Sequence, residues 1–128
     1  MPRRAPLWPE TIEAVRAARQ ASKAAKTPED RPLAFRTRLG AAWKPNGMSS
    51  GYARIAKRAG IYREGVTFGS FRSTFQTIAD NADDPIATSV IMGHTDNSMA
   101  GRYRQRVLDE KLVAVTDHVR NWLFGEPG

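Results

Sequence analysis

The chain has 128 residues, with 20 Lys and Arg against 13 Asp and Glu, 41% hydrophobic residues and no cysteine. This length allows one domain or part of one, and the absence of cysteine excludes a disulfide framework and a thiolate metal site. No apolar run approaches the roughly 20 residues that cross a bilayer. The basic residues at the N-terminus are not followed by the apolar stretch of a signal peptide. We therefore expect a soluble, cytoplasmic protein with no membrane partner.

Positive charge is concentrated in the first half of the chain. Residues 1–63 carry 14 basic and 4 acidic side chains, whereas residues 64–128 carry 6 basic and 9 acidic ones. A basic region beside a mildly acidic one is typical of a surface for a polyanion, most simply nucleic acid. A basic face that only aids solubility is the alternative. We expect double-stranded DNA to be the partner, with nucleoid association, bound chiefly through Arg36, Arg38, Arg54, Lys57 and Arg58.

Helix and turn signals alternate in the first part of the chain. Pro9 suits the first turn of a helix, which is expected to fade in the Ala/Lys stretch before Thr27. The alternation in residues 33–38 predicts a short strand, followed by a turn at Gly40 and a candidate return strand over residues 41–43. These residues are the small β element of the expected fold.

The rest of the chain has mostly helical periodicity. Asp83 or Asp84 is expected to cap a helix with Pro85 at its first position and Gly93 just past its end. Helices are expected over about 49–58, from 67 or 70 through 79, over 85–92, over about 98–104 and over 109–124. In the last of these helices, the apolar side chains are expected to face the core; they are Leu112, Val115, Val119, Trp122 and Leu123. The fold class is therefore mostly α (α+β).

Most common enzyme signatures are missing from the sequence. There is no phosphate-binding G-x-x-x-x-G-K-[ST] loop and no H-E-x-x-H zinc motif, and two histidines are too few for a His-rich metal site. The Asp83–Asp84 pair is interpreted as a helix cap, because Pro85 follows it directly. The chemistry-bearing residues that remain are Arg72, His94 and Tyr103. We expect no metal site and no cofactor.

The spacing of these three residues is specific, although each residue type alone is common in structural roles. Arg72 opens an R-x-T-F sequence, the Met92-Gly93-His94 turn lies 22 residues after it, and Tyr103 follows His94 by nine. In these features the chain resembles the tyrosine recombinase, or phage integrase, family. The catalytic domain of that family carries an H-x-x-R segment, an L-G-H turn and a nucleophilic Tyr at these spacings.

The resemblance implies site-specific DNA recombination or integration, by strand cleavage and rejoining through a phosphotyrosine intermediate. Tyr103 would be the nucleophile, and its covalent adduct keeps the bond energy, so that rejoining needs no ATP. Arg72 would bind two phosphate oxygens and stabilise charge in the transition state. His94 would donate to the same oxygens or handle the tyrosine proton. All three side chains should therefore converge on one basic concavity.

The sequence also departs from the family's pattern. Gly69 stands where the family commonly has His or another polar residue, and Gln105 stands where His is frequent. The family's first catalytic Arg, its Lys on a β-hairpin and its N-terminal core-binding domain cannot be assigned in this chain. The resemblance thus implies that residues 1–128 form a partial catalytic domain, its C-terminal part, which is weak or inactive alone.

Two other interpretations remain open. In the first, the chain is a non-catalytic DNA-binding module that retains the recombinase fold. In the second, it is a small basic helical protein that matches the three family residues by chance. Recombinases act as tetramers and often exchange C-terminal segments, so the resemblance implies other protomers as partners through the helix over residues 109–124. Packing of that helix on its own core is the alternative.

Overall fold

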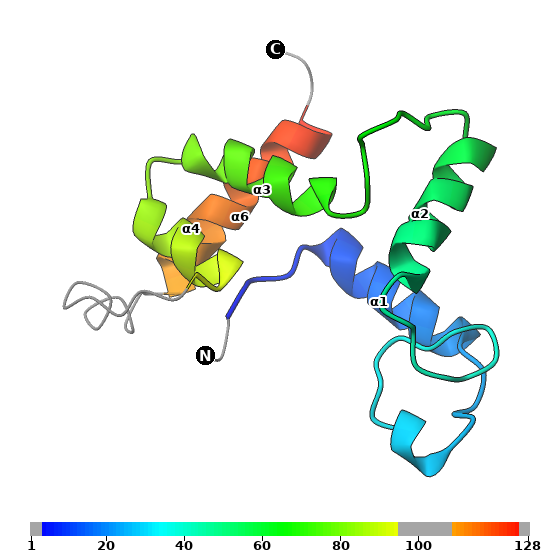
Figure 1. Cartoon of the computed structure of the whole chain (residues 1–128). Coiled ribbons are helices and arrows are strands. Elements are labelled where there is room, and N and C mark those ends of the chain that lie inside the picture. The colour runs from blue at the N-terminus through cyan, green and yellow to red at the C-terminus, as the bar shows by residue number, and fades with distance from the viewer. Residues whose placement is uncertain (1–3, 95–108, 126–128) are drawn as a thin grey trace. The chain divides into compact units, whose positions relative to one another are not determined.

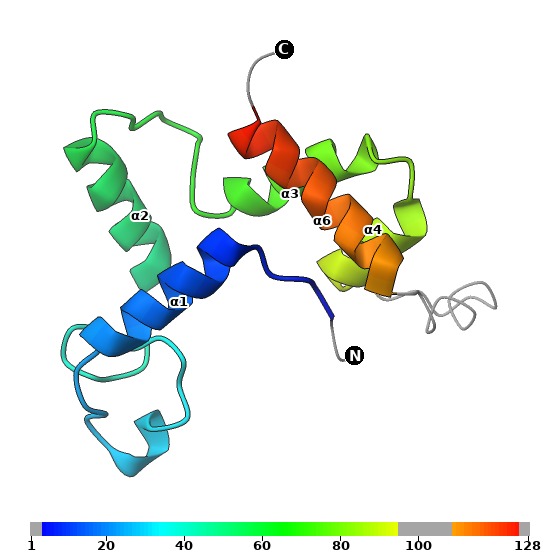
Figure 2. The same cartoon turned by 180° about the vertical axis from the view of Figure 1, so that it is seen from behind.

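The structure, a computed structural model, describes residues 4–94 and 109–125 and is helical within these ranges (Figure 1, Figure 2). Its helices are α1 (Pro9–Ala21), α2 (Gly47–Arg58), α3 (Ser70–Asp80), α4 (Pro85–Met92) and α6 (Asp109–Phe124), with a 3₁₀ turn, η1 (Pro28–Asp30), after α1. The expectation of a mostly α fold is confirmed. The helix expected over residues 98–104 lies outside the described ranges. None of the described helices is both long enough and apolar enough to cross a membrane.

The chain divides into two compact units. The first, which we call the core unit, combines Met1–Trp8 with Arg72–Gly128, and the second, the basic unit, is Pro9–Phe71. The basic unit contains 12 Lys and Arg against 5 Asp and Glu, whereas the core unit contains 8 of each. The whole net charge of +7 therefore belongs to the basic unit.

The hydrophobic core lies in the core unit, where α4 packs against α6. The buried residues of this cluster come from α3, α4 and α6 and are Ala79, Ala87, Leu112, Val115 and Val119. The N-terminal segment joins them through Trp8, whose indole N–H donates to the Thr116 carbonyl at 2.9 Å. The Trp8 ring also lies edge-on to Phe124, with 6.1 Å between ring centroids. The N-terminal segment is thereby held against α6, although 108 positions separate Trp8 from Thr116 in the sequence.

The inward face predicted for α6 is correct over its first part only. Leu112, Val115 and Val119 are buried, whereas Trp122 and Leu123 are 54% and 52% exposed, so their inward placement is wrong. The reason is length: α6 has 16 residues, and α4, against which it packs, has 8. At a rise of about 1.5 Å per residue, the end of α6 extends past the surface that α4 supplies.

The small β element is not found, because residues 33–38 and 41–43 form no strand in the described structure. The predicted turn is present: the Gly40 N–H donates to the Thr37 carbonyl, and the Thr37 N–H donates to the Ala41 carbonyl at 2.8 Å. The pairing stops there, because the Ala41 N–H donates to the Thr37 hydroxyl at 3.2 Å and not to a backbone carbonyl, and the Ala42 N–H donates to the Asp30 side chain at 3.2 Å. A strand needs a continuous partner, and a side chain of η1 takes the place of that partner here.

Candidate functional site

The end of α4 positions His94 through its backbone. Gly93 has φ +71°, in the left-handed region that favours glycine, and terminates the helix. Its N–H donates to the Val90 carbonyl at 3.2 Å, and the His94 N–H donates to the Ser89 carbonyl at 3.0 Å. This pair of bonds is a Schellman motif, which closes a helix and fixes the direction of the chain that leaves it. The His94 side chain is exposed directly after this turn.

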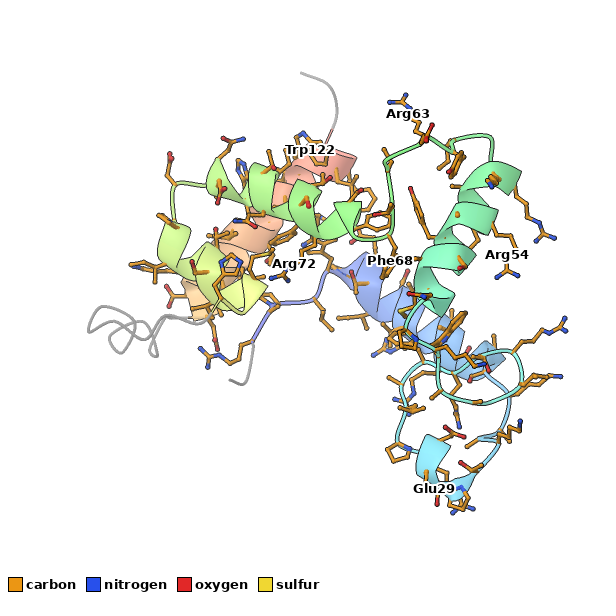
Figure 3. All side chains as sticks on the ribbon, viewed as in Figure 1. Glu29, Arg54, Arg63, Phe68, Arg72 and Trp122 are labelled. Carbon is orange, nitrogen blue, oxygen red and sulfur yellow. The ribbon has the colours of Figure 1, made fainter. Side chains whose placement is uncertain are left out.

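Arg72, on the first turn of α3, reaches the same turn. Its Nη2 donates to the Met92 carbonyl at 2.8 Å. The last carbonyls of a helix have no partner within the helix, so the guanidinium satisfies one that α4 leaves at its end. Arg72 and the Gly93–His94 turn are therefore held together, although 22 residues separate Arg72 from His94 in the sequence (Arg72 is labelled in Figure 3).

The third candidate, Tyr103, lies outside the described residues, so the convergence of all three side chains stays a prediction. No cluster of three or more His, Cys, Asp or Glu side chains that could hold a metal ion occurs within residues 4–94 and 109–125.

The Arg72 guanidinium can do two different things at this place. It has five N–H donors in a planar fork, and a single bond to a carbonyl does not exhaust them. The fork suits two oxygens of a phosphate, which is the role the resemblance implies. The same cation also complements the negative end of the α4 dipole, which is a purely structural role.

The basic unit carries all five residues expected to bind DNA. Arg54, Lys57 and Arg58 lie at the end of α2 with the i, i+3 and i+4 spacing that places them on one helix face, and all three are exposed. Figure 3 shows Arg54 extending away from α2. The Lys57 ammonium lies 4.8 Å from the centroid of the Tyr62 ring, a cation–π contact that holds its position. This face, the α2 cation face, offers its charges to solvent.

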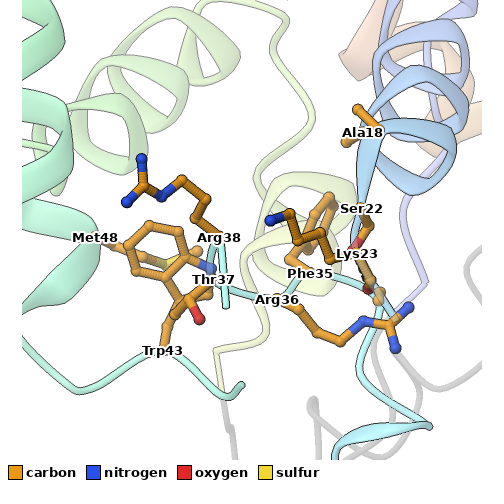
Figure 4. A pocket seen from close by; sticks show the side chains of 11 residues that line it. Ala18, Ser22, Lys23, Phe35, Arg36, Thr37, Arg38, Trp43 and Met48 are labelled. Atoms are coloured by element: carbon orange, nitrogen blue, oxygen red, sulfur yellow. Dashed lines mark hydrogen bonds between the residues drawn. The ribbon is translucent and has the colours of Figure 1, made fainter. Parts of the chain in front are cut away.

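Arg36 and Arg38 lie elsewhere in the basic unit. They line a hollow of about 350 Å³ together with Lys23, Phe35 and Trp43 (Figure 4). Sequence reasoning assigned the two arginines to DNA but missed the aromatic side chains beside them. The available signal was local, because Phe35 and Trp43 flank both arginines closely in the sequence. The five residues expected to bind DNA thus fall into two groups, three on the α2 cation face and two in the hollow.

No family model, no curated protein and no solved structure matches the chain.

Proposed function

We propose that this chain is the C-terminal part of a tyrosine recombinase-type catalytic domain, which binds double-stranded DNA and takes part in its cleavage and rejoining through Tyr103. The observation that carries the proposal is the 2.8 Å bond from Arg72 to the Met92 carbonyl, next to His94. A phosphate must contact both side chains during attack, and this bond keeps Arg72 at the turn from which His94 projects. The sequence spacing alone did not require that proximity.

The proposed reaction is a pair of transesterifications. The Tyr103 phenol oxygen attacks the phosphorus, the bond from phosphorus to one deoxyribose oxygen breaks, and a DNA hydroxyl is released. That hydroxyl, or one from a second strand, later attacks the phosphotyrosine and frees Tyr103. Arg72 binds the two non-bridging oxygens as negative charge grows on them. His94 exchanges the proton of the attacking or leaving oxygen.

We expect the isolated chain to cleave DNA weakly. Two charged residues of the family's site, the first Arg and the Lys, cannot be assigned here. Removal of one preorganised donor typically lowers the rate about 100- to 1,000-fold, and residues that act as a unit need not contribute additively.

The test is a pool of nicked duplexes with randomised sequence around the nick and a radioactive label, which traps any covalent adduct. We expect a weak labelled protein band on a denaturing gel, and the same band should be absent with Tyr103→Phe, which retains the ring and lacks only the nucleophilic oxygen. A band of equal strength in both proteins would contradict the assignment of Tyr103. No band in either protein, together with salt-dependent duplex binding, would support the second candidate function.

The second candidate is a non-catalytic DNA-binding module. It is favoured by the charge distribution, because the whole net charge lies in the basic unit while the unit that holds Arg72 and His94 is neutral. In both candidates duplex DNA binds through the basic unit, chiefly through the α2 cation face together with Arg36 and Arg38.

Neutralising that face should weaken duplex binding whatever the DNA sequence. With Lys57→Gln and Arg58→Gln combined, we expect the slope of log affinity against log salt to fall by about 2, since each phosphate contact contributes about 1. Lys111→Gln is the matched control, because Lys111 is an exposed cation near the start of α6 in the core unit. Equal slopes for the double variant and the unmodified chain, or no duplex binding at low salt, would contradict both candidate functions.

A further inference from the structure

The hollow of the basic unit is built from several segments of that unit alone. The end of α1 contributes Ala18 and Ala21, and the segment of residues 34–38 forms another wall. Trp43 and Met48, around the start of α2, complete it (Figure 4). Its volume of about 350 Å³ falls in the range of about 300–1,000 Å³ that is typical of small-molecule sites.

The wall that carries Arg36 and Arg38 is held in place by the backbone. The Gly40 carbonyl accepts from the Lys26 N–H at 2.9 Å, which ties the turn to the chain that leaves α1. Gly40 is buried, has φ +83°, and a Cβ there would collide with the Ala24 carbonyl oxygen. Only glycine permits this close approach, so the turn sets where the two arginines enter the hollow.

The charge inside the hollow is entirely positive. Lys23, Arg36 and Arg38 line it, and none of its eleven lining residues, all of which the structure describes, is acidic. The Nε of Arg36 is buried and has no hydrogen-bond partner among the described residues. A guanidinium partly removed from water without an acceptor is unfavourable, and a neighbouring anion relieves that cost. The hollow therefore favours an anionic ligand.

Two aromatic rings in the hollow remain in contact with water. Trp43 is 40% exposed and Phe35 is 47% exposed. In Figure 4, Arg38 lies at the end with Trp43 and Met48, and Arg36 lies at the end with Ser22. Partly exposed aromatic side chains next to cations are a combination that suits nucleotides, because a base can stack on a ring while the cations contact the phosphate.

We infer that this hollow binds a single nucleotide, with its base stacked on Trp43 and its phosphate at Arg36 and Lys23. The inference goes beyond the proposed function and does not depend on it, since it involves neither Tyr103 nor the α2 cation face. The ligand is either a free mononucleotide or one unpaired nucleotide of a single strand. Both present the same ring and phosphate to the same side chains.

The test is a titration of the full chain with each probe, in which binding is measured by calorimetry and by tryptophan fluorescence. The probes are AMP, adenosine, ribose 5-phosphate, inorganic phosphate, an eight-residue oligothymidylate and a heptaglutamate peptide. We expect AMP to bind at least about tenfold more tightly than adenosine or inorganic phosphate, because only AMP supplies both the stacking ring and the anion.

Paired variants assign the contacts. Trp43→Leu should abolish AMP binding, Trp43→Phe should retain most of it, and Trp122→Leu, in the core unit, should leave it unchanged. Arg36→Gln should weaken AMP about tenfold without affecting adenosine, whereas Arg54→Gln on the α2 cation face should have no effect. Circular dichroism of each variant confirms that it is folded.

Each outcome decides the inference. Tighter binding of the oligothymidylate than of AMP, lost with Trp43→Leu, identifies a single strand as the source, and the reverse order identifies a free nucleotide. If inorganic phosphate or the heptaglutamate peptide binds as tightly as AMP, the hollow is a simple anion site and the inference is overturned. No binding of any nucleotide, or unchanged binding with Trp43→Leu and Arg36→Gln, would overturn it as well.

Discussion

The core unit and the basic unit differ in what they contribute to the molecule. In the core unit, side chains of α3, α4 and α6 are buried together, and acidic and basic residues are equal in number. In the basic unit, Ala56 is the buried hydrophobic residue, while Ile55, Ile61 and Phe71 are each more than 60% exposed. Burial and positive charge are therefore separated along the chain.

This separation has a physical consequence. Concentrated like charge opposes compaction, so it is best tolerated where little apolar surface has to be brought together. The buried cluster of the core unit supplies the stabilising burial, since it removes apolar area from water. We expect truncation of apolar side chains to lower stability mainly in the core unit, and loss of cations to weaken binding mainly in the basic unit.

The largest effect on stability is expected for Leu112→Ala. Leu112 is 1% exposed and belongs to the buried cluster, and truncation of such a residue typically lowers the free energy of unfolding by about 2–5 kcal/mol. Ile55→Ala, in the basic unit at 67% exposure, should change it by less than about 0.5 kcal/mol. Urea unfolding followed by circular dichroism measures both. Similar losses from the two variants would refute the division between the units.

Replacing each of two glycines by alanine is expected to change the free energy of unfolding in opposite directions. Gly93→Ala should destabilise the chain by about 1–2 kcal/mol, because an alanine at φ +71° is strained. Gly51→Ala should stabilise it by about 0.5–1 kcal/mol, because Gly51 lies within α2 and nothing is within 4 Å of the position of an added Cβ. Thermal unfolding detects both shifts. Equal signs would show that the Schellman motif does not terminate α4.

A loss of stability comparable to that of Gly93→Ala, or slightly smaller, is expected at the other end of α4. The Asp84 carboxylate accepts from the Ala87 N–H at 3.0 Å. We expect Asp84→Ala to lower the free energy of unfolding by about 1 kcal/mol, because it removes this helix cap. Asp80→Ala removes the same charge from the end of α3, where an acidic residue is unfavourable, so it should not destabilise the chain. Denaturant titration of both variants compares them directly. Equal destabilisation would indicate a general charge effect instead of a cap.

Local signals predicted the helices well. The Asp84 cap, Pro85 at the first position and Gly93 after the end are all as expected for α4, because capping depends on residues within one turn of the chain. The start of α2 was predicted about two residues too late, and its end at Arg58 was predicted correctly. The expected strand over residues 33–38 failed, because a strand depends on a partner distant in sequence.

The sequence by itself determined the approximate positions of the described helices, the concentration of charge in one part of the chain, and the spacing of Arg72, His94 and Tyr103. All of these follow from composition and from periodicity over a few residues. Only the tertiary structure decided that Arg72 reaches the end of α4, that Trp122 and Leu123 lie outside the core, and that Arg36 and Arg38 share a hollow with Trp43. Such contacts depend on how separate segments meet, and no periodicity within a single segment contains that information.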